Sequence, residues 1–245
     1  MNDKGGGKDW INFVFKRWFY IEKFTRKQNI ESFWHFDTDT MILDDLSRHE
    51  EKFSSYDCTE QCRSNCMNGF INNRDVVRQY VEKINELFTR EELLEEQKRE
   101  FEEENPGFAF TEMRAYDIFK TEEDIESFHL ENVVDNETFD DNLGAPRDYM
   151  TESSNKGKKI KKIYPAPNGQ FYGVKKDTGN PVRFITLNMS RVYEDYFYKV
   201  LRHIEKKYKP DKTNTNVKLK RSVMEMPYPM ALRLRPFLNR LRSIK

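Results

Sequence analysis

The sequence has no long apolar run and no recognisable leader. No stretch of hydrophobic residues is long enough to span a bilayer, and the residues after Met1 do not follow a signal-peptide pattern. We therefore expect a cytoplasmic protein, or a peripheral protein at a membrane surface. Disorder throughout is not expected, because 14% of the 245 residues are aromatic and can build a core, while 34% are charged and suit a soluble surface.

Cysteine is scarce and odd in number. Cys58, Cys62 and Cys66 lie four residues apart, and without a secretion signal they do not indicate a disulfide framework. A zinc site with His49 as a fourth ligand is an alternative. However, structural zinc ligands usually form close pairs on two knuckles, and this run has no second knuckle. We expect the three thiols to pack in the core or to occupy turns.

Net charge is also absent, since 42 Lys and Arg balance 42 Asp and Glu, but the two signs are unevenly distributed. Residues 206–245 hold twelve basic and two acidic residues, whereas residues 1–205 hold 30 basic and 40 acidic ones. We predict a domain over 1–205 and a basic, amphipathic extension over 206–245. Such an extension suits contact with anionic lipid or with the acidic body of the protein itself. Nucleic acid ranks third, and we do not expect it as a partner.

Helical periodicity predicts several helices. Residues 10–30 carry Trp10, Val14, Trp18 and Ile21 on one face, with Asp9 as the N-cap. Five further helices are expected. They are a helix at 74–89, an acidic helix at 90–105, a helix that follows Thr111 as its N-cap, a short helix that begins near residue 121, and a closing helix at 191–208.

Short apolar runs predict the strands between these helices. They occur before Asp37, around Cys58, at 66–73 with Asn68 and Gly69 as an interruption, and at 183–189. The segment after Thr121 adds a short strand, and a loop is expected from Gly144 to Lys162. Asn168-Gly169 between aromatic-rich arms indicates a late β-hairpin. The class is therefore α/β, with a mixed sheet flanked by helices.

The pair Asp37 and Asp39 is the main chemical signal. The two acids follow the apolar stretch "FWHF", and alternate positions at a strand end place both carboxylates on one side. Ligands of open α/β sheets bind at the carboxyl edge of the sheet, and two acids there suit Mg²⁺ or Mn²⁺. A polar turn is the simpler interpretation of the same residues.

One enzyme family with this pattern is that of the haloacid-dehalogenase-type phosphatases. Their first strand also ends in Asp-x-Asp, and the first Asp is a nucleophile. That family has Thr or Val two residues after the second Asp, where this chain has Met41. Asp140-Asp141 is similar to a later metal motif of the family, but no convincing Lys and Thr/Ser pair lies between.

The chain more closely resembles the metal-dependent glycosyltransferases of the GT-A fold, particularly those of surface-polysaccharide synthesis. The resemblance rests on Arg17-Trp18 in a helix before "WHFDTDTMIL", on Asn68 and Gly69 in "CMNGFINN", and on Glu112 in "FTEMRAYDIF". It covers about residues 10–120 well and 120–205 loosely. It implies a GT-A-like, Rossmann-like domain. The strand-helix-strand unit that grips the nucleotide base is not found before Asp37, so we expect the domain to be N-terminally incomplete.

The resemblance also implies the ligands and roles. They are a nucleotide-sugar donor, a glycan or lipid-linked acceptor, and Mn²⁺ or Mg²⁺ held by Asp39 and Asp37. Asn68 and Gly69 would line the sugar site, and Glu112 would take the acceptor proton in an inverting reaction. Glu112 can equally be a first-turn acid that favours the helix dipole.

The resemblance leaves two positions open. Arg114 would pair with a phosphate or with a surface acid. The additional metal-binding His of many relatives is not found, since Asn188 stands at the comparable place, and His129 and His203 are expected to be ordinary core or surface residues. A degenerate, binding-only domain is the non-enzymatic alternative.

Overall fold

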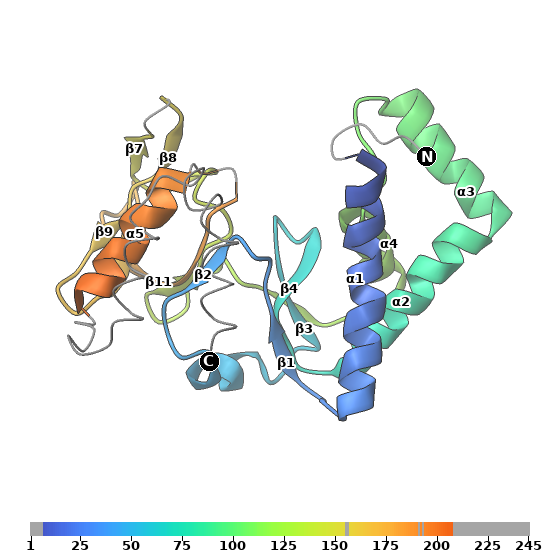
Figure 1. The fold of residues 1–245 in the computed structure, drawn as a ribbon, viewed down its shortest axis with the longest axis horizontal. Coiled ribbons are helices and arrows are strands. Elements are labelled where there is room, and N and C mark those ends of the chain that lie inside the picture. Colours follow the sequence, from blue (N-terminus) through green and yellow to red (C-terminus); the bar gives the residue numbers. More distant parts are fainter. Residues whose placement is uncertain (1–6, 155–156, 191, 193, 208–245) are drawn as a thin grey trace, which may run out of the picture. The chain divides into compact units, whose positions relative to one another are not determined.

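The computed structural model describes residues 7–154, 157–190, 192 and 194–207, so the predicted basic extension lies almost wholly outside the described residues. It is a mixed α/β structure, as the sequence predicts (Figure 1). Its described residues divide into two compact units. Among the described residues, the first unit contains 7–142 and 184–190, and the second contains 143–154, 157–183, 192 and 194–207.

The first unit is built on a four-stranded mixed sheet in the order β1-β4-β3-β5. Its strands are β1 Phe33–His35, β3 Cys58–Gln61, β4 Cys66–Ile71 and β5 Ser127–His129. β4 lies antiparallel to both β1 and β3, while β3 and β5 are parallel. β2 Thr40–Ile42 and β6 Glu137–Phe139 instead pair with the last part of β11, which spans Pro181–Asn188.

Helices stand together beside this sheet (Figure 1). They are α1 Gly7–Gln28, α2 Arg74–Thr89, α3 Glu91–Lys98 and α4 Glu112–Glu122, with the π-helix η2 Arg99–Glu104 after α3. The 3-10 helix η1 Leu46–Phe53, between β2 and β3 in the chain, lies apart from this group. Trp18, Tyr80, Tyr116 and Phe119 fill the core between the helices and the sheet, each with an exposed fraction of 1% or less. The large aromatic content therefore does build a core.

Two expectations for the first helix are wrong. α1 begins at Gly7, so Asp9 lies inside the first turn instead of capping it. Trp10 is 46% exposed and does not join the buried face, which Ile11, Val14 and Trp18 form. The inward face at this end of the helix is formed by Ile11, one position after Trp10.

The second unit contains two hairpins and a helix. β7 Thr151–Ser153 pairs with β8 Lys159–Lys161, and β9 Tyr164–Pro165 pairs with β10 Phe171–Val174. The hairpin turn at Asn168-Gly169 is confirmed, whereas the expected loop from Gly144 to Lys162 contains the β7–β8 hairpin. α5 Glu194–Lys207 closes the unit. None of the helices in the described ranges is long and apolar enough to cross a membrane.

Candidate active site

Arg17 joins two of the predicted site residues in the first unit. Its guanidinium lies 2.5 Å from Asp37 Oδ1 and 3.2 Å from Glu112 Oε1. The exposed fractions of the side chains are 16% for Arg17, 46% for Asp37 and 9% for Glu112. Residues separated by 20 and 95 positions therefore converge on one cation.

The local sequence explains why these three side chains meet. Arg17 precedes Trp18, whose burial holds α1 against the core. β1 ends at His35, and the amide of Thr40 donates to the carbonyl of Asp37, so Asp37 starts a tight turn. Glu112 is the first residue of α4, and its carbonyl accepts a 2.6 Å hydrogen bond from the hydroxyl of Tyr80.

The carboxyl of Glu112 lies in an environment that resists charge. Burial raises its pKa, and the Arg17 guanidinium acts in the opposite direction. Glu112 Oε2 is buried and has no hydrogen-bond partner in the part of the chain that the structure describes. One carboxylate oxygen is therefore held by Arg17 while the other lacks such a contact.

Asp39 shares this environment. Burial raises its pKa, and the nearby charge of Asp37 raises it further, while a hydrogen bond with Ser190 opposes the shift. Its Oδ1 is buried without a hydrogen-bond partner among the described residues. A cation beside these two carboxylates would offset the unfavourable charge, and oxygen donors are the ligands that Mg²⁺ and Mn²⁺ prefer. The residues present therefore fit such an ion.

Asn68 and Gly69 lie in β4, and the predicted irregularity is present, because the register between β3 and β4 shifts at these residues. Asn68 is 3% exposed and donates to Gln61 Oε1 at 2.7 Å, while its own Oδ1 is buried without a partner among the described residues. Gly69 has φ +97°, and a Cβ there would lie less than 3.0 Å from Leu130 and Thr59. Packing within the sheet alone therefore requires glycine at position 69.

Arg114 contacts acids rather than an open site. It donates to Glu100 at 2.9 Å and to Asp117 at 2.5 Å, which is the surface-acid alternative of the sequence analysis. With Glu100, Asp117 and Thr111 it also lines a cavity of about 330 Å³. Asp37, Asp39 and Glu112 are not among the residues that line this cavity.

The cysteines differ in environment. All three are free thiols. Burial raises the pKa of Cys58 to about 12, and its Sγ lies 3.6 Å from the hydroxyl of Tyr116. A hydrogen bond with Cys66 lowers the pKa of Cys62. His49 lies 3.3 Å from Asp44 instead, and no metal-ligand cluster among the described residues includes a cysteine.

A cluster that the sequence analysis did not predict lies at the ends of β5 and β6. Ligand atoms of His129, Glu131 and Asp141 lie within 4.8 Å of one another. Asp141 accepts a 2.5 Å hydrogen bond from the amide of Cys62. The charges of Asp37, Asp39 and Asp141 all raise the pKa of Cys62, in opposition to its hydrogen bond with Cys66. His129 and Glu131 are two residues apart and Asp141 follows ten residues later. The amide of Phe139 donates to the carbonyl of Leu130, which brings the segment before Asp141 beside the other two residues.

Comparison with known proteins finds no match for this chain. No protein-family model, no curated protein and no solved structure matches it.

Proposed function

We propose that the first unit is a GT-A-like glycosyltransferase domain. It would move a sugar from a nucleotide-sugar donor to a glycan or lipid-linked acceptor with Mn²⁺ or Mg²⁺. The observation that carries the proposal is the convergence of Arg17, Asp37 and Glu112, three residues of the motifs on which the resemblance rests. Carboxyl groups with raised pKa values gather at functional sites more often than elsewhere, which supports the same interpretation for Asp39 and Glu112.

Each residue has a role in this proposal that follows from its contacts. Asp39 and Asp37 would hold the ion, which would neutralise the charge that develops on a departing diphosphate. Arg17 would fix the position of Asp37 and offset part of the negative charge of the site. It would also lie close enough to Glu112 to control the protonation of that carboxyl.

Glu112 would serve as the general base toward the acceptor hydroxyl. A base is most effective when its pKa is close to the working pH, and burial shifts Glu112 in that direction. The buried, partner-free Oε2 is the atom that would receive the proton. Asn68 and Gly69 would contribute by holding β4 in shape, because both are buried within the sheet.

The test is release of a nucleoside diphosphate from UDP-, GDP- and dTDP-sugars with Mn²⁺. We expect release with one of these donors, loss of at least a hundredfold in Glu112→Gln, and a comparable loss in Asp39→Asn. Asp75→Asn, on the exposed side of α2, is the matched control and should leave the rate unchanged.

Two other functions predict different results. A degenerate, non-catalytic domain that lacks the nucleotide grip would give no heat of binding with any of these donors and would release no nucleotide. A haloacid-dehalogenase-type phosphatase would hydrolyse p-nitrophenyl phosphate, and Asp37→Asn would abolish that activity. The ion pair between Asp37 and Arg17 argues against a freely reactive Asp37 nucleophile, so the glycosyltransferase remains the preferred proposal.

A further inference from the structure

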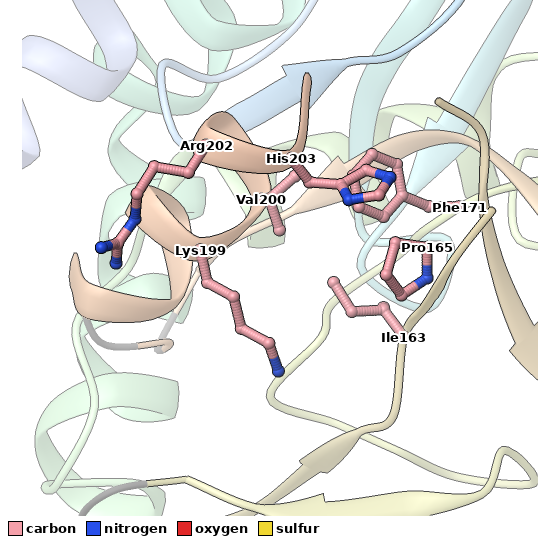
Figure 2. A pocket seen from close by; sticks show the side chains of 7 residues that line it. All are labelled: Ile163, Pro165, Phe171, Lys199, Val200, Arg202 and His203. Carbon is pink, nitrogen blue, oxygen red and sulfur yellow. The ribbon is translucent and has the colours of Figure 1, made fainter. Parts of the chain in front are cut away.

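The second unit contains a cavity of about 330 Å³ that the proposed function does not use. Its volume lies at the lower end of the range for small-molecule sites. Figure 2 shows that α5 provides one wall and the segment from Ile163 to Phe171 provides the other. The residues that line it are Ile163, Pro165, Phe171, Lys199, Val200, Arg202 and His203.

The lining separates into an apolar floor and a basic rim. Ile163, Phe171 and Val200 are buried, with exposed fractions of 5% or less. Lys199 and His203 flank the cavity, whereas Arg202 extends away from Phe171 (Figure 2). His203 lies 5.2 Å from the ring of Phe171 and 3.2 Å from the carbonyl of Ala166, which fixes the imidazole at the rim.

The charge of the second unit favours an anion. Residues 143–183 and 191–207, which belong to the second unit, hold 14 Lys and Arg against 6 Asp and Glu, whereas residues 1–142 and 184–190 of the first unit hold 18 against 34. Lys199 contacts Glu152 at 3.3 Å, but it is 54% exposed. Exposed pairs of this kind are weak, so a phosphate can compete for Lys199.

We propose that this cavity binds a lipid phosphate, with part of the apolar chain against the exposed ring of Pro165 and the phosphate at Lys199 and His203. Stacking of nucleic-acid bases does not fit, because Phe171 is 1% exposed and His203 packs edge-on against it. The segment 208–245 of the chain itself does not fit either, since its ten basic and two acidic residues carry the same sign as the rim. The inference is independent of the proposed sugar transfer.

Calorimetric titration of the full chain with alkyl phosphates below their micelle concentration tests the site. We expect dodecyl phosphate to bind at least tenfold more tightly than inorganic phosphate or dodecyl maltoside. From butyl through octyl phosphate, each buried methylene should tighten binding about fourfold until the cavity is full. The NMR signals of the His203 ring, assigned with His203→Gln, should shift during the titration.

Matched variants show whether this cavity is responsible. Lys199→Glu should weaken binding at least fivefold, whereas Lys159→Glu, at an exposed position of β8 outside the cavity, should change it less than twofold. Lys199→Gln serves as a second variant if Lys199→Glu does not fold. Asp39→Asn should bind dodecyl phosphate like the unmodified protein, which separates this result from the test of sugar transfer.

Three outcomes would overturn the inference. Inorganic phosphate could bind as well as dodecyl phosphate, Lys199→Glu could behave like Lys159→Glu, or a single-stranded oligonucleotide could bind more tightly with the same sensitivity to Lys199→Glu. The last result would assign the surface to nucleic acid.

Discussion

Replacement of Gly69 by alanine should destabilise the first unit strongly. Gly69 has φ +97°, a conformation that residues with a Cβ rarely adopt. Its neighbour across the sheet is Thr59, where the register between β3 and β4 shifts. The Thr59 hydroxyl donates to the carbonyl of Asn68 and accepts from the amide of Phe70, both at 2.7 Å, so it occupies the space beside Gly69.

The magnitude follows from two costs. The left-handed backbone costs an alanine about 1–2 kcal/mol. Overpacking against Leu130 and Thr59, each less than 3.0 Å from the added Cβ, costs about 1–3 kcal/mol more. We expect Gly69→Ala to lower the free energy of unfolding by about 3 kcal/mol, which corresponds to a fall in Tm of about 6–12 °C.

Gly107→Ala is the matched control. An added Cβ at Gly107 meets nothing within 4 Å, so this variant should lie within about 0.5 kcal/mol of the unmodified protein. Thermal and urea unfolding followed by circular dichroism measures both variants. If Gly69→Ala were as stable as Gly107→Ala, the packing described for β3 and β4 would be incorrect, and a ligand-based reason for glycine at this position would regain weight.

Three further predictions concern neighbouring parts of the first unit. Thr59→Val should lower the free energy of unfolding, measured in urea, by about 2–4 kcal/mol, because it leaves the carbonyl of Asn68 and the amide of Phe70 without their hydrogen-bond partner. Thr59→Ser keeps the hydroxyl and should lower it by about 1 kcal/mol. Arg17→Met should lower the free energy of unfolding by about 3 kcal/mol, because it leaves the buried carboxylate of Glu112 without its cation. Adding Glu112→Gln to Arg17→Met should restore most of this stability. Because burial raises the pKa of Glu112, the stability of Arg17→Met should be highest at acidic pH and fall as the pH rises through that raised pKa; a loss independent of pH would refute this. Mass spectrometry should find Cys62 alkylated by iodoacetamide at pH 7.5 at least tenfold faster than Cys58, whose pKa is about 12; equal rates would contradict the described environments.

Local patterns predicted the local elements well. The apolar face of α2 repeats with helical periodicity and is buried as expected. The Asn168-Gly169 turn follows from side-chain chemistry within a few residues. Such features depend on residues that are close together in the sequence, so they can be predicted from the sequence alone.

Features that depend on distant partners were less predictable. The β7–β8 hairpin lies in a Lys-rich segment whose strands are three residues long, too short for an alternating pattern. Arg17 was part of a sequence motif, but its contact with Asp37 and Glu112 depends on how α1 and α4 pack. The resemblance places Gly69 at a sugar site, whereas the approach of Leu130 and Thr59 to Gly69 depends on the packing of distant segments and cannot be read from the strand alone.

The most direct test of the central claim is calorimetric titration of the intact chain with UDP-, GDP- and dTDP-sugars in the presence and absence of Mn²⁺. Our account predicts that one donor binds in the presence of Mn²⁺, that binding is lost without the ion, and that Asp39→Asn abolishes it while Asp75→Asn does not. Absence of heat with every donor, or equal binding by Asp39→Asn, would contradict the claim that Asp37 and Asp39 hold an ion against a diphosphate.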